Sequence, residues 1–373
     1  MAHRKDSYDY YKSPTGEDIS KVSIFIGPNA SGKTNIMRLF TFLSVFLRTS
    51  RQDRDPGDLY IPYKNFFDNQ KDSTFKLEFE LDKEIFIYSL ILNRNIIKKE
   101  RLQLKKIEKY AKPIIIFDRK LDAIEYLHED YFKNLTKSKL PNIRSDISFI
   151  PFIRSLYDIE VIKKVFDYFN KFNTNINEVG EINIPPFQGE AIDLYLNDPE
   201  LKEKMISIIR NFDLGIDSIE INKETLSSEL SKYEVYAIHK YLEENKKLGL
   251  RYESSGTQHL FFILAKLLKT LKEEGVAIID EFERGLHTES LNKIMTYFID
   301  ENSDSKSQFL FTSHSHDILM KRDMHQIYLV GKNQDNGSYV KRLNDVPGVR
   351  TDDNFKNKYL SGSYGAFPKI TIK

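Results

Sequence analysis

The stretch Gly27-Pro28-Asn29-Ala30-Ser31-Gly32-Lys33-Thr34 decides how the rest of the chain is interpreted, because it matches the pattern GxxxxGK[ST] in full. Directly before it, residues 22–26 (VSIFI) form a short apolar run that predicts a buried strand. Directly after it, Asn35 to Leu47 has the spacing of an amphipathic helix. Strand, glycine-rich loop and helix in this order predict a phosphate-binding loop. Its backbone N–H groups would point at phosphate oxygens, at the positive end of the helix dipole.

Two side chains of this loop have specific expected tasks. Lys33 is expected to bridge the β- and γ-phosphates of a nucleotide, and Thr34 to place its hydroxyl on Mg²⁺. The loop therefore predicts ATP and Mg²⁺ as ligands. The alternative, a chance turn rich in glycine and serine, is disfavoured because all three elements occur in order.

Two carboxylates, Asp280 and Glu281, follow a second apolar run at 276–279 (VAII). Buried carboxylates at the carboxyl end of a strand need a partner, and a magnesium ion beside the phosphate loop would supply one. We expect Asp280 to hold Mg²⁺ through water, and Glu281 to orient and deprotonate the attacking water. The alternative is an acidic surface turn, which is common after a strand but is the weaker interpretation downstream of a phosphate loop.

His314 follows a third apolar run, 309–312 (FLFT). A histidine there can hydrogen-bond the γ-phosphate and sense its presence. A lone surface histidine is the alternative. His287 lies close enough to the acidic pair to be expected near a dimer seam, whereas His316 is interpreted as a bystander.

Ser254, Ser255 and Gly256 precede an apolar helix expected at 259–271. Serine and glycine at a helix N-terminus leave free N–H groups for an anion. By itself the pattern is best explained as an ordinary helix cap. The pattern lies shortly before the strand that is expected to end at Asp280.

The ordered set of motifs resembles the ABC-type ATPases of the OLD and abortive-infection group, which are relatives of the SMC proteins. The motifs are the phosphate loop, SSGTQ (254–258), IIDE (278–281), GLH (285–287) and TSHS (312–315). The tail at 350–368 is also similar to a stretch, RxDxxxxxxYLxGxYGAxP, of the nuclease-free members. The resemblance covers both ends of the chain, and the middle (about 105–245) only in helical character.

The resemblance implies an ATPase in which two copies close around Mg-ATP, with slow or partner-regulated turnover. Ser255 and Gly256, with Ser254 beside them, would cap the γ-phosphate held by the other copy. Residues 284–287, which include His287, would be the D-loop along the interface. A glutamine-loop equivalent is placed at 142–146, and the family's usual opening strand (FxVxNFxSF) is not found. At the N-terminus Tyr8, Tyr10 and Tyr11 could stack on adenine, although a frayed polar tail is the favoured interpretation.

The fold class predicted is α/β: a P-loop ABC-type nucleotide-binding domain with an antiparallel β-meander subdomain and an inserted helical lobe. Strands alternate with helices at both ends, which is typical of a largely parallel, covered sheet. The runs 75–81, 85–92 and 96–104 alternate as a meander would, residues 173–199 are expected to be irregular, and charged helices are expected at 200–212 and 227–247. We predict three segments: 1–120 (phosphate loop and meander), 121–247 (helical lobe) and 248–373 (signature loop, acidic strand end and switch histidine).

Composition limits the partners. Lys plus Arg (56) nearly balances Asp plus Glu (55), so the net charge of +1 gives no global attraction to nucleic acid. A local basic patch would be needed, and its candidates, which otherwise form a solvated face of the meander, are Lys98, Lys99, Arg101, Lys105 and Lys106. Cysteine is absent, the N-terminus is polar, and no run reaches the ~18 apolar residues of a membrane span. We therefore expect a cytoplasmic protein without a membrane partner.

The function expected from the resemblance is a switch subunit of a bacterial anti-phage system. It would act as a homodimer or higher oligomer and control a separate effector, a nuclease, through which DNA or RNA could also be contacted. The alternative is an SMC-like ATPase of DNA repair or chromosome maintenance that clamps DNA. A transporter ATPase subunit is disfavoured because the signature is not LSGGQ.

Overall fold

The computed structural model describes residues 9–49, 69–94, 96–108, 111–133, 135–177, 180, 185–212, 214–225 and 231–367. The chain forms two compact units that interleave along the sequence. The first comprises Met1–Asp9, Ser20–Met37 and Asn173–Lys373, and the second comprises Tyr10–Ile19 and Arg38–Phe172. The three consecutive segments expected from the sequence stay a prediction.

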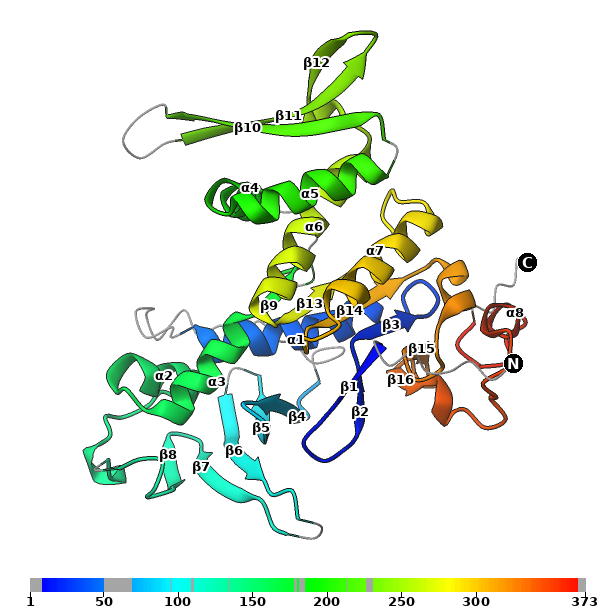
Figure 1. Cartoon of the computed structure of the whole chain (residues 1–373). Coiled ribbons are helices and arrows are strands. Elements are labelled where there is room, and N and C mark those ends of the chain that lie inside the picture. The colour runs from blue at the N-terminus through cyan, green and yellow to red at the C-terminus, as the bar shows by residue number, and fades with distance from the viewer. Residues whose placement is uncertain are drawn as a thin grey trace. The chain divides into compact units, whose positions relative to one another are not determined.

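A six-stranded sheet forms the centre of the first unit, with the strand order β16-β15-β3-β14-β13-β9 (Figure 1). Its strands are β3 (Val22–Ile26), β9 (Phe172–Thr174), β13 (Val276–Ile279), β14 (Gln308–Ser313), β15 (Ile327–Lys332) and β16 (Ser338–Arg342). β3 pairs in parallel with β14 and β15, β13 pairs in parallel with β14, and β16 pairs antiparallel with β15. The predicted, largely parallel arrangement and the mixed α/β fold class are confirmed.

The strands are buried because helices cover the sheet. α1 (Lys33–Arg48) follows the phosphate loop, α6 (Ser255–Glu273) precedes β13, and α7 (Thr288–Glu301) joins β13 to β14. Apolar side chains of α6 and α7 share one hydrophobic core with those of β3, β13 and β14. The two parallel strands joined by α7 form a strand–helix–strand unit, in which the carboxyl ends of the strands lie at one edge.

The middle of the chain is only partly helical. α4 (Pro185–Asn197) and α5 (Pro199–Asn211) are followed by a three-stranded sheet of β10 (Ile216–Thr225), β11 (Ser231–Tyr241) and β12 (Glu244–Gly249), and α5 packs against α6 and β10 (Figure 1). The charged helix predicted at 227–247 is therefore wrong, as is the irregular segment where α4 lies. Tyr, Val and Ile favour strands, and pairing with β10 outweighs the helix propensity of the lysines and glutamates.

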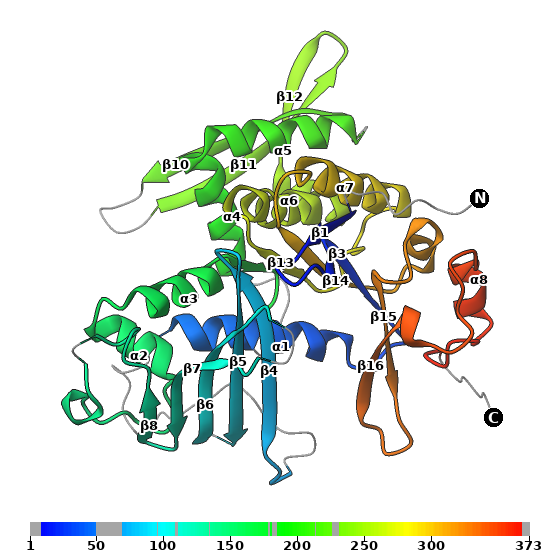
Figure 2. The same cartoon turned by 60° about the horizontal axis from the view of Figure 1, so that its bottom comes forward.

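A five-stranded antiparallel sheet dominates the second unit (Figure 2). Its strands, in spatial and chain order, are β4 (Ser73–Leu81), β5 (Glu84–Asn93), β6 (Ile96–Lys105), β7 (Ile114–Lys120) and β8 (Ala123–Leu127). The predicted meander is confirmed, and β8 is an additional strand within the segment expected to be helical. α2 (Phe149–Leu156) and α3 (Glu160–Asn170) follow, and the rings of Phe79 and Tyr168 stack 4.8 Å apart where α3 meets β4. A short pair of strands, β1 (Tyr10–Lys12) and β2 (Asp18–Ser20), precedes β3.

Tyr8 lies outside the described residues. Tyr10 is only 8% exposed, which leaves its ring little free surface for an adenine. Burial, with a contribution from Glu80, raises the pKa of Tyr11 to about 12. The frayed tail favoured for these tyrosines is therefore wrong at Tyr10, where the chain begins a strand.

The C-terminal region packs against the segment that follows the switch histidine. Here η6 (His316–Lys321) contacts α8 (Phe355–Leu360), with the ring centroids of His316 and Tyr359 5.1 Å apart. The remaining short 3-10 helices are η4 (Lys137–Lys139), η5 (Leu250–Tyr252) and η7 (Leu343–Asp345). Among the residues that the structure describes, no helix is both long and apolar enough to cross a bilayer.

Candidate functional site

The phosphate loop lies between β3 and α1, and its backbone leaves no room for side chains at two positions. A Cβ added at Gly27 would lie 2.1 Å from the carbonyl oxygen of Val330. Gly32 has a φ of +107°, which residues with a Cβ rarely adopt. These glycines let the loop bend tightly back over the carboxyl end of β3. α1 then begins at Lys33, with its first N–H groups facing the loop.

The amine of Lys33 reaches back across the loop. Its Nζ donates hydrogen bonds to the carbonyl oxygens of Gly27 (2.8 Å) and Pro28 (3.1 Å) and lies 3.4 Å from Nδ1 of His314. Burial lowers the pKa of Lys33, and the nearby carboxylates, of which Asp280 contributes most, oppose this shift. A cation held among polar groups in this position is placed to receive an anion.

Ser31 supplies an independent sign of a ligand. Its side chain is 1% exposed, and its buried hydroxyl has no hydrogen-bond partner within the described part of the chain. Buried polar atoms are nearly always satisfied, so an orphaned hydroxyl inside a phosphate-binding loop fits an incoming acceptor oxygen.

The carboxylate of Asp280 lies next to this loop. Its Oδ2 accepts a hydrogen bond from Thr34 Oγ1 at 2.7 Å, and its Oδ1 accepts one from Thr312 Oγ1 at 2.5 Å. Asp280 is 1% exposed. The described residues contain no cluster of three histidine or acidic side chains that could hold a metal. One hydroxyl and one carboxylate still fit Mg²⁺, which usually takes one or two protein ligands and fills its shell with water and phosphate oxygens.

Glu281 has an unusual backbone. Its φ is +49°, the left-handed region that a residue with a Cβ avoids. The strand order places Glu281, Asp280 and His314 at the carboxyl ends of neighbouring strands, β13 and β14. The structure thus brings residues predicted from distant segments to one open pocket of about 740 Å³. The residues that line this pocket are Asn29, Ala30, Ser31, Gly32, Lys33, Thr34, Asn35, Asp280, Glu281, Glu283, Arg284 and His314.

The signature residues do not line this pocket. Ser254 caps α6 by accepting a hydrogen bond from the N–H of Thr257 at 3.1 Å, and Ser254 and Ser255 are exposed. Gly256 is buried against the turn that contains Gly285, where an added Cβ would lie 2.1 Å from the Gly285 carbonyl oxygen. His287 caps α7 by accepting from the N–H of Glu289 at 3.3 Å. None of these four residues lines the pocket, and two of them, Ser254 and His287, cap helices.

Three residues of the site were not predicted. Thr312 bonds Asp280, Glu283 accepts a hydrogen bond from the N–H of His314, and Asn175 pairs with the backbone of Asp280. Thr312 lies inside the quoted motif TSHS (312–315), and Glu283 lies between the quoted motifs IIDE (278–281) and GLH (285–287), so their proximity could have been found. Asn175 lies 105 residues before Asp280, in a segment expected to be irregular, and no local pattern marks it.

The fold and the pocket are those of a P-loop ATPase. A family model described as "AAA domain, putative AbiEii toxin, Type IV TA system" matches residues 22–321. This match covers more than half of the chain, so the protein belongs to that family.

Other relatives are more distant. The DNA replication and repair protein RecF of Oenococcus oeni is 24% identical over 258 residues, which cover 65% of this chain and 58% of RecF. The chain thus spans less than two thirds of that relative. Among solved structures, the SMC head domain from Thermotoga maritima covers 90% of this chain and 95% of its own, at 14% identity and a TM-score of 0.41. An SMC head bound to the C-terminal winged-helix domain of ScpA covers 89% and 94%, at 12% identity and a TM-score of 0.44.

Proposed function

We propose that the protein binds and hydrolyses Mg-ATP at the pocket between the phosphate loop and the acidic strand end. The observation that carries this proposal is the meeting of Lys33, Thr34, Asp280, Glu281 and His314 at one pocket. When bound, Mg²⁺ would neutralise charge on the phosphates, with the Thr34 hydroxyl as a ligand and Asp280 holding the ion through water.

Different groups of the protein would bind the phosphates and take part in hydrolysis. The backbone N–H groups of the loop and the amine of Lys33 bind and orient the phosphates. Glu281 accepts the proton of the attacking water, and the imidazole of His314 holds the γ-phosphate side of the pocket. The hydrogen bonds of Lys33 to the loop carbonyls would have to be exchanged for phosphate contacts on binding.

We further propose that two copies close around the nucleotide. The exposure of Ser254 and Ser255 at the start of α6 supports this, because a second molecule can reach the Ser255 side chain and the first N–H groups of the helix. The γ-phosphate bound by one copy would then be capped by Ser255 and Gly256 of the other. His287 would lie along the same interface.

As biological role we propose a switch subunit in anti-phage defence that controls a separate effector nuclease, with slow or partner-regulated turnover. The support is the family's description, a putative AbiEii toxin of a type IV TA system, together with the tail motif at 350–368.

A second candidate function, DNA clamping in repair, is favoured by the similarity to RecF. Three of the five basic side chains that the sequence suggested for such a surface are paired with carboxylates. Lys98 pairs with Asp72 at 2.7 Å, Lys105 pairs with Glu78 at 2.9 Å, and Arg101 pairs with Asp118. Residual binding of the isolated protein to duplex DNA with a steep salt dependence would support clamping, because released counterions set that slope.

Two substitutions test the ATPase. Lys33→Ala should abolish ATP binding, whereas Glu281→Gln should retain ATP and accumulate dimers, since the bound nucleotide is no longer cleaved. Calorimetric titration with ATP and mass photometry with and without ATP measure these effects. Hydrolysis by Glu281→Gln at the unmodified rate would refute the assignment of the base, and monomers alone in the presence of ATP would refute the dimer.

A further inference from the structure

The carboxamide of Asn175 makes two hydrogen bonds to the backbone of Asp280. Its Nδ2 donates to the Asp280 carbonyl oxygen at 2.9 Å, and its Oδ1 accepts from the Asp280 N–H at 2.8 Å. β13 ends one residue earlier, at Ile279, and β9 ends at Thr174. The side chain therefore replaces the backbone pairing that a longer neighbouring strand would provide. Asn175 is 8% exposed, so water competes little for these bonds.

Thr312 holds the next residues from β14. Its Oγ1 accepts a hydrogen bond from the Glu281 N–H at 2.9 Å, and its carbonyl oxygen accepts one from the Phe282 N–H at 3.1 Å. Residues 280–282 are thus held by Asn175 and Thr312, so the backbone N–H of each of them has a defined partner. This segment leaves β13 and carries both acidic side chains into the pocket.

The conformation of Glu281 explains why such a clamp is needed. A φ of +49° is unfavourable for glutamate, and a residue persists there only when its surroundings determine the backbone. Backbone strain of this kind is concentrated at active sites. Displacements of about 1 Å at reacting groups can lower turnover about a hundredfold, so a residue that fixes this backbone affects turnover without contacting the substrate.

We propose that Asn175 is a positioning residue for hydrolysis: by fixing the backbone of Asp280, it aims the carboxylate of Glu281 at the attacking water. This inference rests on the proposed ATPase function. Asn175 lines no part of the pocket, so it should affect the rate of cleavage more than the affinity for ATP.

The test compares Asn175→Ala with Asn173→Ala. Asn173 is a matched control because it is an asparagine two residues earlier, in β9, is 5% exposed, and donates to Thr270 Oγ1 at 3.1 Å rather than to the acidic segment. Asn175→Ala should lower kcat at least tenfold and leave the calorimetric Kd for ATP within threefold. In the nucleotide-free protein, amide hydrogen exchange of a peptide covering 276–286 should become faster. Asn173→Ala should keep kcat and the exchange of that peptide near those of the unmodified protein.

Several results would overturn the inference. They are a kcat of Asn175→Ala within twofold of the unmodified value, a loss of ATP affinity parallel to the loss of kcat, or equal effects of the two substitutions. If Asn175→Ala does not fold, Asn175→Leu takes its place, because it keeps the approximate size, adds no charge and loses both hydrogen bonds to the Asp280 backbone. The unmodified protein shows whether the proposed ATPase function itself is wrong, because it would then neither bind nor cleave ATP. The role of Asn175 is wrong if the unmodified protein cleaves ATP and one of the results above is found.

Discussion

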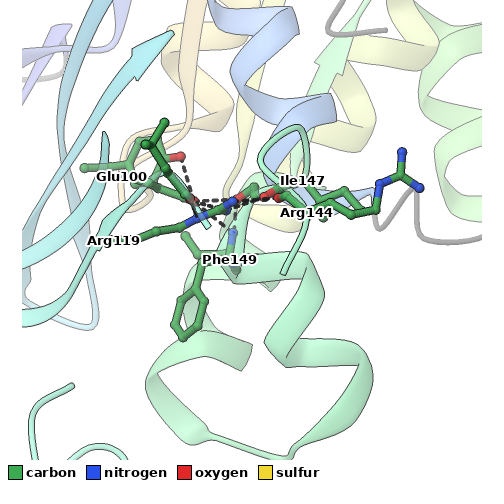
Figure 3. A network of polar contacts seen from close by, with 9 residues as sticks. Glu100, Arg119, Arg144, Ile147 and Phe149 are labelled. Atoms are coloured by element: carbon green, nitrogen blue, oxygen red, sulfur yellow. Dashed lines mark hydrogen bonds and ion pairs between the residues drawn. The ribbon is translucent and has the colours of Figure 1, made fainter. Parts of the chain in front are cut away.

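Replacing Arg119 with methionine should strongly destabilise the β-meander unit, because it removes one half of a buried ion pair. Arg119 and Glu100 are both 0% exposed, and Arg119 Nη1 lies 3.3 Å from Glu100 Oε2 (Figure 3). Arg119 also donates through Nε to the Leu121 carbonyl oxygen at 2.6 Å and through Nη2 to that of Arg144 at 2.6 Å. A further bond joins Nη1 to the Ile147 carbonyl. The guanidinium thus fastens the chain between β7 and α2 to the sheet.

Glu100 is the group that the substitution would leave without a counter-charge. Its carboxylate accepts hydrogen bonds from Tyr88 Oη (3.0 Å), Ser148 Oγ (2.6 Å) and the Phe149 N–H (2.9 Å). Burial, and next the charge of Glu100, raise the pKa of Tyr88 well above its ordinary value, so the phenol stays a donor. These bonds would remain in Arg119→Met, while the anion would lose its cation and three carbonyls would lose their donor.

The expected cost follows from this arrangement. Removing one partner of a buried ion pair costs about 3–5 kcal/mol, because the remaining charge stays desolvated. Methionine fills part of the vacated volume, so an additional cavity cost should be small. The double variant Arg119→Met/Glu100→Gln should be less destabilised than the sum of the single variants, since it leaves no uncompensated charge.

The measurement has to report on this unit, because the two units can unfold separately. The chain has no tryptophan, so we would follow urea unfolding by circular dichroism and assign the transition by hydrogen exchange of peptides from β5 to β7. A loss of less than about 1 kcal/mol, the scale of an exposed pair, would refute the reasoning. Full additivity in the double variant would also refute it, because the two groups would then not interact.

Two further predictions concern α6. Gly256→Ala should lower the melting temperature and weaken ATP-dependent dimer formation, because the new Cβ would lie 2.1 Å from the Gly285 carbonyl oxygen and overpacking costs about 1–3 kcal/mol; an unchanged melting curve would contradict this contact. Burial lowers the pKa of His259 to about 4. Below about pH 6.5 the unfolded chain binds a proton at His259 that the folded chain does not bind. The contribution of the neutral, buried His259 to the free energy of unfolding is therefore fully present above about pH 6.5 and is lost as the pH falls to about 4. Denaturation between pH 4 and 7 should show a shallower pH dependence for His259→Gln, and an unchanged slope would exclude His259 as its source.

The parts of the fold that the sequence predicted are those with strong local signals. VSIFI before the phosphate loop and VAII before Asp280 are continuous apolar runs, which are typical of strands covered on both faces. In β4 to β6 apolar and polar residues alternate, because successive side chains of a strand point to opposite faces of the sheet. The segment 231–249 was misjudged because its lysines and glutamates suit a helix on a solvated face. Whether it forms a strand depends on pairing with β10, a contact that no local window contains.

In the candidate site, too, the residues with a local sequence signal were predicted and the residue that depends on a distant contact was not. Lys33, Thr34, Asp280 and Glu281 are recognisable because a phosphate loop needs a fixed spacing and an acidic pair must follow a buried strand. Asn175 has no such constraint: any segment that ends beside β13 could supply a carboxamide, and its partner is the backbone, which is the same at every residue. Asp280 can therefore be recognised in the sequence as a carboxylate after a buried strand. Asn175, which fixes its backbone, can be recognised only from its position in the folded structure. The residues that set the geometry of a catalytic carboxylate are, for this physical reason, the ones that motif reading systematically misses.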